Sequence, residues 1–526
     1  MSGSVTLVST GVTGQGINGA IMPSVSGDGT KVAFSSDSSS LVAGDTNNRF
    51  DVFVKNLTTG ALTLVSAGAN GQGNDASVDP SISADGSKVA FDSTASNLVA
   101  GDTNGTGDVF VKDLTTGALT RISTGANGQG NGGSFTPSIS ADGTKVAFYS
   151  SASNLVAGDT NNRNDVFVVT LATGAVTRVT TGAGGQPDSD SFGPSLSADG
   201  TKVAFYSFAS NLVPGETDIG GNVFVKDLTT GAVTRVTTAI NGQENGLSSA
   251  PSISADGTKV AFNSSASNLV AGDTNGKDDI FVKDLATGTL TRVSIGANGE
   301  GNDNSFVPAI FPDGSKVAFS SEATNLVAGD TNGTQDVFVK DLATGVVTLV
   351  STGANGQGDG GSYRSAISGD GTKIVFESRA SNLVAGDTNG VGDVFIKNSL
   401  GQGTGGANPV IGSGPDTLVL QLQQDAYQGS AQYTVSIDGT QVAGVQTASA
   451  TRASGLFDTL TVQADLAPGN HTVAVNFLND AYAGTPSTDR NLFVASGTYN
   501  GVSIPGAQLD LLGSGPASLG FTEITA

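Results

Sequence analysis

The sequence repeats itself with a period of about 57 residues, and a fixed period of this kind is typical of repeat architectures. The phrase Pro-Ser-Ile-Ser-Ala-Asp-Gly starts at Pro80, Pro137 and Pro251, and close variants start at Pro23, Pro194, Pro308 and Ser365. Each copy is followed at a fixed distance by a Lys-Val-Ala-Phe-type segment, a polar loop and an Asp-Val-Phe-Val-Lys-type segment. The strict period predicts one supersecondary unit that is copied seven times.

Each repeat is predicted to contain four short strands. In the second repeat these are 80–83, 88–93, 108–114 and 118–123, with turns at Gly86 and Gly117 and a long loop over 94–107. One aromatic residue recurs in the third strand of every copy: Phe53, Phe110, Phe167, Phe224, Phe281, Phe338 and Phe395. Four antiparallel strands per copy predict an all-β, seven-bladed β-propeller with four-stranded blades.

The two ends of the repeated region predict a closed ring. The seventh repeat reaches 393–397 and then lacks its fourth strand. The N-terminal segment 5–9 matches 62–66, the fourth strand of the first repeat, at an offset of one period. We therefore expect the N-terminal strand to complete the last blade, which removes an open sheet edge. An open solenoid would need capping repeats, and the sequence contains none.

Composition excludes several classes of protein. The chain has 526 residues and 37% hydrophobic residues, which is more than one ordinary domain needs. It has no Cys, so disulfides and thiolate metal sites are excluded. It contains no run of 18 apolar residues, so no membrane span is expected. The net charge of -23 argues against nucleic acid and anionic membranes as partners.

The periodicity ends after Asn398. Residues 400–408 are rich in Gly and are predicted to be a flexible linker. Alternating segments such as 417–422, 433–437 and 472–477 follow, in a stretch of the size of one β-sandwich domain. The predicted domains are therefore a propeller over 1–399, a linker over 400–408 and a β-sandwich over 409–526.

An acidic loop precedes the third strand of every repeat. Six copies read Asp-x-Asn-x-x-x-Asp, and the fourth keeps three side-chain oxygens of other types. The seven sets are Asp45, Asn47, Asp51; Asp102, Asn104, Asp108; Asp159, Asn161, Asp165; Glu216, Asp218, Asn222; Asp273, Asn275, Asp279; Asp330, Asn332, Asp336; and Asp387, Asn389, Asp393. Hard cations prefer such oxygens, so one Ca²⁺ in each blade loop is predicted. The alternative is that these residues form Asx turns without a metal.

Two stretches of the chain resemble known families. Residues 80–91 and 108–114, with their equivalents over residues 5–399, resemble the PD40 or TolB-like propeller repeat. That resemblance implies the propeller fold and no single activity. Residues 412–420, 425–429 and 479–494 resemble the calcium-dependent xylan-binding modules, carbohydrate-binding family 60, over most of 409–505.

The second resemblance implies a calcium site and a sugar site in the C-terminal domain. It makes Asp425, Asp480, Asp489 and Asn491 the candidate Ca²⁺ ligands, with one or more ions. It implies contacts between sugar and Tyr427, Gln428, Tyr482 and Arg490. Two Asp-Ala-Tyr-x-Gly phrases, at 425–429 and 480–484, agree with this reading because paired acids and aromatics on loops suit a binding site. The alternative is that the two phrases are symmetric turns.

Few residues suit catalysis. The only histidine is His471, which falls on a predicted strand of the C-terminal domain, so the propeller has no Ser-His-Asp triad. Glycosidase chemistry needs only two carboxylates and stays open as an alternative. The segments before the first strand differ most between repeats, with Phe135, Phe192, Phe306 and Tyr363 at equivalent positions. These aromatics suit either stacking on sugars or packing between blades.

The sequence therefore predicts a secreted, non-enzymatic, calcium-binding bacterial protein that binds a polysaccharide or cell-surface glycan in adhesion or in an extracellular matrix. No cleavable leader is recognisable after Met1, so three alternatives stay open: the leader has been removed, export uses an uncleaved C-terminal signal, or the protein stays inside the cell. Two alternatives remain at this stage. One is a glycoside hydrolase or lyase with an accessory binding module, and the other is a scaffold whose propeller face binds another protein.

Overall fold

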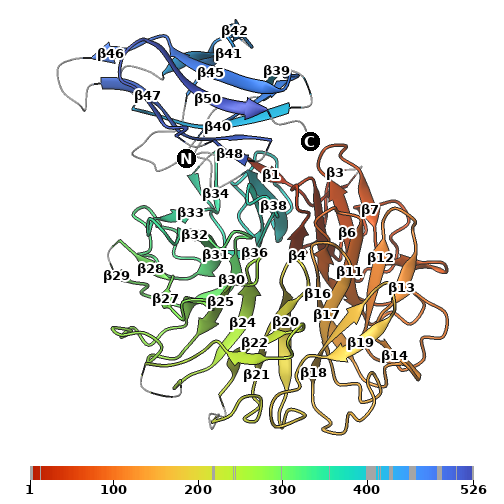
Figure 1. Cartoon of the computed structure of the whole chain (residues 1–526). Coiled ribbons are helices and arrows are strands. Elements are labelled where there is room, and N and C mark those ends of the chain that lie inside the picture. Colours follow the sequence, from red (N-terminus) through yellow and green to blue (C-terminus); the bar gives the residue numbers. More distant parts are fainter. Residues whose placement is uncertain are drawn as a thin grey trace. The chain divides into compact units, whose positions relative to one another are not determined.

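The computed structural model describes residues 4–523 except 12–13, 216–219, 241, 243, 298, 355, 399–409, 413, 415, 426–430, 443, 449–457, 483–488, 501 and 505. All described regular elements are strands (Figure 1). Contacts divide the chain into two compact units, Ser4–Asn398 and Ser399–Ala526 with Met1–Gly3. The predicted linker 400–408 lies outside the described residues. Among these residues no helix is both long and apolar enough to cross a membrane.

The described part of Ser4–Asn398 forms propeller-like, four-stranded antiparallel sheets, one for each of the seven repeats. In repeats 1 to 3 the strands are β4 (Ala20–Val25), β5 (Lys31–Ser36), β6 (Asp51–Asn56) and β7 (Leu62–Leu64); β10 (Ser77–Ile82), β11 (Lys88–Ser93), β12 (Asp108–Asp113) and β13 (Leu119–Arg121); and β16 (Ser134–Ile139), β17 (Lys145–Ser150), β18 (Asp165–Thr170) and β19 (Ala175–Arg178). In repeats 4 to 6 they are β20 (Ser191–Leu196), β21 (Lys202–Ser207), β22 (Asn222–Asp227) and β23 (Val233–Arg235); β24 (Ser248–Ile253), β25 (Lys259–Ser264), β26 (Asp279–Asp284) and β27 (Leu290–Arg292); and β30 (Ser305–Ile310), β31 (Lys316–Ser321), β32 (Asp336–Asp341) and β33 (Val347–Leu349). Repeat 7 has β36 (Ser362–Ile367), β37 (Lys373–Ser378), β38 (Asp393–Asn398) and, from the N-terminus, β1 (Val5–Leu7).

The first and the last repeat are neighbours. Strand β1 pairs antiparallel with β38, with Thr6 opposite Ile396, as the sequence predicted. The Lys373 ammonium donates a hydrogen bond to the Gly29 carbonyl at 2.8 Å. This contact from repeat 7 to repeat 1 matches the one from repeat 1 to repeat 2, in which Lys31 donates to Gly86 at 2.7 Å. The N-terminal strand thus covers the edge that repeat 7 would otherwise leave open.

The hydrophobic core lies between successive sheets. One cluster combines Ala33 and Val52 of repeat 1 with Val89, Phe91 and Phe110 of repeat 2, and equivalent clusters follow along the chain. The recurrent phenylalanine of the third strand stacks on one in the second strand, as in the Phe91–Phe110 pair with ring centroids 5.7 Å apart. Full burial of each such ring stabilises the fold by about 2–3 kcal/mol.

A short hairpin follows the fourth strand in most repeats. The pairs are β2 (Thr10–Gly11) with β3 (Gly14–Gln15), β8 (Ala67–Gly68) with β9 (Gly71–Gln72), β14 (Thr124–Gly125) with β15 (Gly128–Gln129), β28 (Ile295–Gly296) with β29 (Gly299–Glu300), and β34 (Thr352–Gly353) with β35 (Gly356–Gln357). The hairpin packs directly on the next acidic loop. A Cβ on Gly68 would lie 1.9 Å from the Leu98 carbonyl oxygen, so only glycine fits there.

The C-terminal unit contains two sheets. The first has the order β39 (Val410–Gly412), β44 (Asp458–Ala464), β40 (Asp416–Asp425), β47 (Asp489–Tyr499) and β46 (Ala481–Tyr482), with β48 (Val502–Ser503) and β49 (Leu509–Leu511) also on β47. The second has β42 (Thr440–Gln441), β41 (Gln432–Ile437), β45 (Gly469–Phe477) and β50 (Gly515–Glu523), with β43 (Gln446–Thr447) on β41. Leu420 of the first sheet and Val475 of the second belong to one buried cluster. Alternate residues of β40 are buried, as expected for a strand with one face on a core.

Candidate functional site

The repeats differ most at one end of their sheets, where the first strand begins and the second strand ends. We call this region the variable end. Seven positions that are equivalent in the first strand are each of a different type: Met22, Asp79, Thr136, Gly193, Ala250, Val307 and Arg364. By contrast, the opposite ends of the first strands line a cavity of about 390 Å³ with almost identical apolar residues such as Ile82, Ile139 and Ile253. Differences between copies of one scaffold are where a specific function is expected.

These seven positions have an unusual backbone. The pairing of the first and second strands shifts at each of them, for example between Val78 and Ser81 and between Phe135 and Ser138. Six of the residues are not glycine yet have positive φ, including 51° at Asp79 and 53° at Thr136. A left-handed conformation at a β-branched residue is strained, and such bulges re-aim side chains next to functional sites.

Repeats 3 and 4 place five aromatic side chains together at the variable end. Tyr149 makes an edge-to-face contact with Phe192, with ring centroids 5.1 Å apart. Phe135 packs on Tyr149, and Tyr206 and Phe208 both pack on Phe192. The sequence pattern indicated Phe135 and Phe192, whereas the other three rings were not predicted. Tyr149 and Tyr206 lie near the end of the second strand, where Ser, Asp, Asn or Glu stands in the other repeats, and Phe208 directly follows that strand in repeat 4.

Acidic and basic side chains occupy the variable end of repeats 2 and 7. Burial raises the pKa of Asp92 well above its ordinary value, and the charge of Asp79 raises it further. Burial also raises the pKa of Asp79, while the charge of Arg364 lowers it. In repeat 7, Glu377 accepts a hydrogen bond from the Met22 amide at 3.2 Å, and the Arg379 guanidinium lies 5.9 Å from the centroid of the Tyr363 ring. Carboxylates next to aromatic rings suit a ligand with hydroxyl groups and flat apolar faces.

The two acids of an acidic loop are bridged by a side chain from the hairpin that follows the fourth strand. We call this hydrogen-bonded arrangement a clasp. In repeat 1 the Gln72 side-chain amide donates to Asp45 at 2.6 Å and to Asp51 at 2.7 Å. The Ser66 hydroxyl donates to the other oxygen of Asp51 at 2.5 Å, and the Asn47 amide donates to Asp51 at 2.9 Å. Gln129, Gln357 and Gln15 make the same two contacts in repeats 2, 6 and 7. The amide nitrogen thus lies between two carboxylates that were predicted to be Ca²⁺ ligands.

An arginine joins or replaces the glutamine in other repeats. Arg178 lies 3.2 Å from Asp159 and 3.8 Å from Asp165, and Arg292 lies 3.1 Å from Asp273 and 3.4 Å from Asp279. Arg121 approaches Asp102 and Asp108 at 3.6 and 3.7 Å. A guanidinium between two carboxylates repels a second cation. The expectation of one Ca²⁺ in every blade loop therefore does not fit the described side chains, and the alternative of turn-forming Asp and Asn residues fits better.

The inner acid of each clasp is buried. Burial is the largest cause that raises the pKa of Asp51, Asp108, Asp165, Asp279, Asp336 and Asp393, and the pKa of Asp165 reaches about 6. The remaining predicted loop residues Asn104, Asn161, Asn275, Asn332 and Asn389 each donate to the inner acid of their repeat. In repeat 4, Asn222 accepts from Arg235 at 2.6 Å, while Glu216 and Asp218 lie outside the described residues. Asp330 and Asp387 complete the glutamine-bridged pairs.

The C-terminal unit brings part of its predicted site together. Asp425 ends β40 directly opposite Asn491 on β47, and the Asn491 amide nitrogen lies 3.5 Å from an Asp425 oxygen. The Arg490 guanidinium donates to the Asn479 carbonyl at 2.5 Å, next to the exposed Asp480. Within the described residues no three acids or histidines cluster as a metal site. Tyr427 and Gln428 lie outside the described residues, as do the side chains of Tyr482 and Asp489. Oxygens of Asp425, Asn491 and Asp480 are the ligand type that Ca²⁺ takes.

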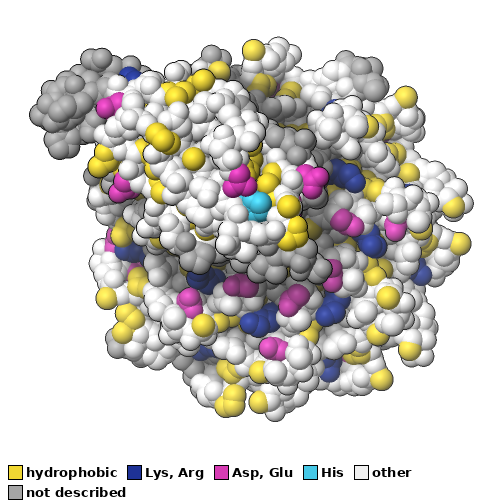
Figure 2. Space-filling model, turned by 45° about the horizontal axis from the view of Figure 1, so that its top comes forward, with side chains coloured by type: hydrophobic (Ala, Val, Ile, Leu, Met, Phe, Trp, Pro, Cys, Tyr) yellow, Lys and Arg dark blue, Asp and Glu magenta, His cyan; other side chains and the backbone are white. Residues whose placement is uncertain are grey.

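The single histidine has a structural environment. His471 Nδ1 lies 2.6 Å from Asp438, and its other ring nitrogen lies 2.7 Å from the Ala467 carbonyl. Figure 2 shows the cyan histidine next to acidic side chains in magenta. Hydrogen bonding to His471 lowers the pKa of Asp438. Both ring nitrogens are thus engaged by neighbouring groups of the C-terminal unit.

Comparison with known families assigns the fold. The model of the TolB β-propeller domain, PD40, matches residues 185–454, and this chain belongs to that family. The match runs past the last strand of repeat 7, which ends at Asn398. The model of a Ca-dependent, xylan-binding carbohydrate-binding module matches residues 417–510. No curated protein matches the chain.

Solved structures of similar fold include proteins of different activity. TolB from Acinetobacter baumannii is 15% identical, with a TM-score of 0.35 and coverage of 67% of this chain and 77% of that chain. An oligogalacturonate lyase in complex with manganese is 14% identical, with a TM-score of 0.45 and coverage of 76% and 98%. An acylaminoacyl peptidase is 11% identical, with a TM-score of 0.45 and coverage of 73% and 51%.

Proposed function

We propose that this chain is an extracellular, non-enzymatic polysaccharide-binding protein, in which a closed seven-bladed propeller carries a β-sandwich module that binds a xylan-type glycan through Ca²⁺. The observation that carries the proposal is the match of residues 417–510 to a Ca-dependent xylan-binding module. The juxtaposition of Asp425 and Asn491 at the edge of β40 and β47 supports it. When bound there, the ion would coordinate sugar hydroxyls, and Asp425, Asp480, Asp489 and Asn491 would hold it.

The propeller would serve as a rigid carrier with a second carbohydrate-contacting surface. The aromatic rings at the variable end, Tyr149, Phe192 and Tyr206 among them, offer flat faces for sugar rings. In the closed ring that we infer, every sheet packs between two neighbours, which would hold these side chains in place. A role in adhesion or in an extracellular matrix follows from glycan binding combined with a rigid scaffold. Binding of another protein by the propeller face remains the alternative use of the same surface.

Xylan binding with and without calcium tests the module. The full chain should be retained by insoluble xylan in Ca²⁺ and released by EGTA. Asp480→Asn should weaken retention at least about tenfold, because it removes one charged ligand. Asp465→Asn is the matched control, since Asp465 is an exposed acid of the same unit. Equal retention in EGTA, or equal retention of Asp480→Asn, would contradict a calcium-mediated site.

A polysaccharide-active enzyme is the second candidate, and one observation favours it. Asp79 and Asp92 form a carboxylate pair at the variable end, and burial raises the pKa of both. Two acids with displaced pKa values are what glycoside hydrolysis uses for its acid and its base or nucleophile. In such a mechanism Asp92, which stays protonated to higher pH, would donate the proton.

Release of reducing ends from xylan and from acidic polysaccharides distinguishes the two candidates. The enzyme hypothesis predicts turnover that falls by at least about a hundredfold in Asp92→Asn, the usual range for loss of a general acid. Asp75→Asn is the control, because Asp75 is a half-exposed acid of the same repeat. Absence of any product release by the unaltered chain supports the non-enzymatic proposal.

A further inference from the structure

Six lysines cross the gaps between neighbouring repeats. Each lies on the third strand and donates to the hairpin that follows the previous repeat. The contacts are Lys55 to Thr10 O (2.7 Å), Lys112 to Ala67 O (2.9 Å), Lys226 to Thr181 O (2.9 Å), Lys283 to Thr238 Oγ1 (3.2 Å), Lys340 to Ile295 O (2.7 Å) and Lys397 to Thr352 O (3.0 Å). Burial lowers the pKa of all six, and that of Lys397 reaches about 8. A lysine side chain therefore lies in each of these six gaps.

The gap between repeats 2 and 3 lacks its lysine. Val169 stands at the equivalent position, one period after Lys112 and one period before Lys226. The acceptor that corresponds to Ala67 O and Thr181 O is the carbonyl of Thr124. Among the contacts of the described residues no side chain donates to that carbonyl. Valine has neither the length nor the donor to reach it.

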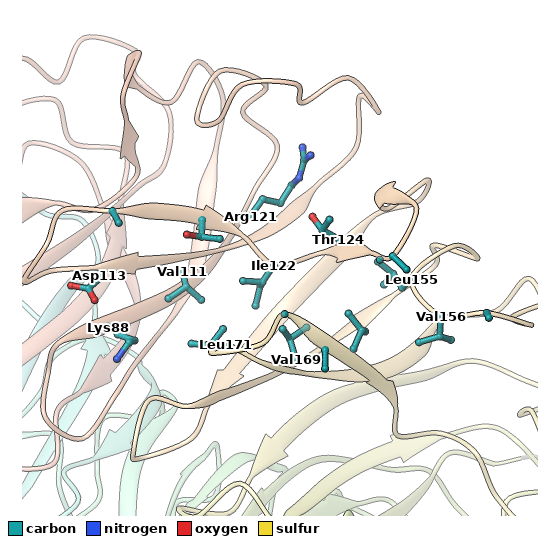
Figure 3. A pocket seen from close by; sticks show the side chains of 18 residues that line it. Lys88, Val111, Asp113, Arg121, Ile122, Thr124, Leu155, Val156, Val169 and Leu171 are labelled. Atoms are coloured by element: carbon teal, nitrogen blue, oxygen red, sulfur yellow. The ribbon is translucent and has the colours of Figure 1, made fainter.

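A cavity of about 680 Å³ occupies this gap. Val111, Ile122, Val169 and Leu171 converge on it from the two repeats, with Thr124 beyond them (Figure 3). The gap between repeats 3 and 4 holds Lys226, and the cavity beside that lysine measures about 390 Å³. Ile122 keeps 6% of its surface exposed, whereas its equivalents Val65, Val179, Val236, Val293 and Val350 are 0% exposed. The missing lysine thus leaves a largely apolar cavity that reaches Thr124.

We propose that this cavity binds an aliphatic primary ammonium compound. Its hydrocarbon chain would lie between Ile122 and Val169, and its ammonium group would donate to the Thr124 carbonyl. The six lysines indicate which ligand suits a gap between repeats, because each places a methylene chain and an ammonium group in equivalent surroundings. The volume lies in the range of small-molecule sites, and the net charge of -23 attracts cations. The site is independent of the glycan-binding proposal.

The charged groups around the cavity do not repel a cationic ligand, because each cation among them lies near a carboxylate. Lys88 and Asp113 line one end and face each other across β11 and β12, so their charges offset one another. Arg121 is held toward Asp102 and Asp108. The Thr124 end carries no cation among the lining residues other than Arg121. An ammonium group that enters beside Thr124 therefore meets a carbonyl and not an uncompensated positive charge.

Calorimetric titration of the full chain with n-hexylammonium tests the proposal. One site is expected in the unaltered chain, and hexyltrimethylammonium, which has the same charge but no N–H donor, should bind at least about tenfold more weakly. Val169→Lys should abolish binding without loss of thermal stability, because lysine stands at this position in six repeats. Lys112→Val should open the equivalent gap before repeat 2 and raise the stoichiometry to two.

Each control distinguishes specific binding in this cavity from nonspecific attraction of cations to the acidic protein. Binding that survives in Val169→Lys, or equal affinity for the quaternary ion, would overturn the proposal. A stoichiometry that stays at one in a folded Lys112→Val chain would show that the missing lysine does not create the site. Circular dichroism on all variants distinguishes lost binding from lost folding.

Discussion

At the scale of single residues, a glutamine side-chain amide lies between two carboxylates that were predicted to bind Ca²⁺. Gln72 bridges Asp45 and Asp51, and its carbonyl oxygen accepts from the Thr46 amide at 3.1 Å. The amide nitrogen therefore donates to both carboxylates, and the amide oxygen also has a partner. Repeat 5 has Glu300 in place of the glutamine, and there Arg292 donates to Glu300 at 2.7 Å. A third carboxylate is thus present only where an arginine compensates it.

This pairing predicts strong coupling between positions 64 and 72. Gln72→Glu should destabilise the chain by about 2 kcal/mol at pH 7, because a donor between two carboxylates becomes a third negative charge. Leu64→Arg alone should be tolerated, since Arg121 accompanies Gln129 in repeat 2. The double variant should recover at least half of the loss. Urea unfolding of the four chains measures this coupling, and additive effects would contradict the clasp.

At the scale of elements, the first strand of each repeat combines a regular and a strained part. Its second half pairs in register and lines the apolar cavity, while its first half contains the bulge with positive φ. Repeat 4 has Gly193 at this position with φ of 57°, which costs glycine nothing. The same turn of the backbone at Val307, with φ of 45°, strains a β-branched residue.

Relief of this strain should raise stability. Val307 is 39% exposed, so its removal loses little packing. Val307→Gly should increase the free energy of unfolding by about 0.5–1 kcal/mol, after the greater freedom of glycine in the unfolded chain is subtracted. Val307→Ala keeps a Cβ at positive φ and should bring no gain. Denaturant midpoints of the two variants decide the matter, and an equal effect of both would argue against strain.

At the scale of the whole propeller unit, the N-terminal strand joins the two ends of the repeated region. Strand β1 covers the edge of β38, and Ser9 donates to Asp393 at 2.5 Å in the clasp of repeat 7. Gln15 bridges Asp387 and Asp393 in the same clasp. Residues from opposite ends of the repeated region thus complete one sheet and one loop.

Removal of residues 1–9 should therefore weaken the entire unit. The melting temperature should fall by at least about 5 °C, because a sheet edge and a buried carboxylate lose their partners. The exposed edge of β38 should also promote association, visible by size-exclusion chromatography. Removal of residues 1–3, which precede β1, is the control and should change neither property. A monomeric nine-residue deletion with an unaltered melting temperature would contradict this account.

Much of the fold was predictable because it depends on local patterns. The strict period, the alternation around Phe110 and the match of 5–9 to 62–66 placed the strands and the closing strand correctly. The glutamines at 15, 72, 129 and 357 also recur with the period, so their role was open to sequence reasoning. It was missed because each glutamine is distant in the chain from the inner acid that it contacts, as Gln72 is from Asp51 and Gln15 from Asp393, and only the fold brings the two together.

The sequence by itself determined the repeated strands, the order of the two units and the resemblance of each to a family. Those properties follow from residue types at fixed spacings, which act over a few residues. Tertiary structure alone decided which groups fill the space between carboxylates, which rings meet at the variable end and which gap between repeats is empty. Those contacts depend on residues that packing brings together from different repeats. The absence of a lysine at Val169 can be interpreted only because the six equivalent lysines each cross their own gap between neighbouring repeats.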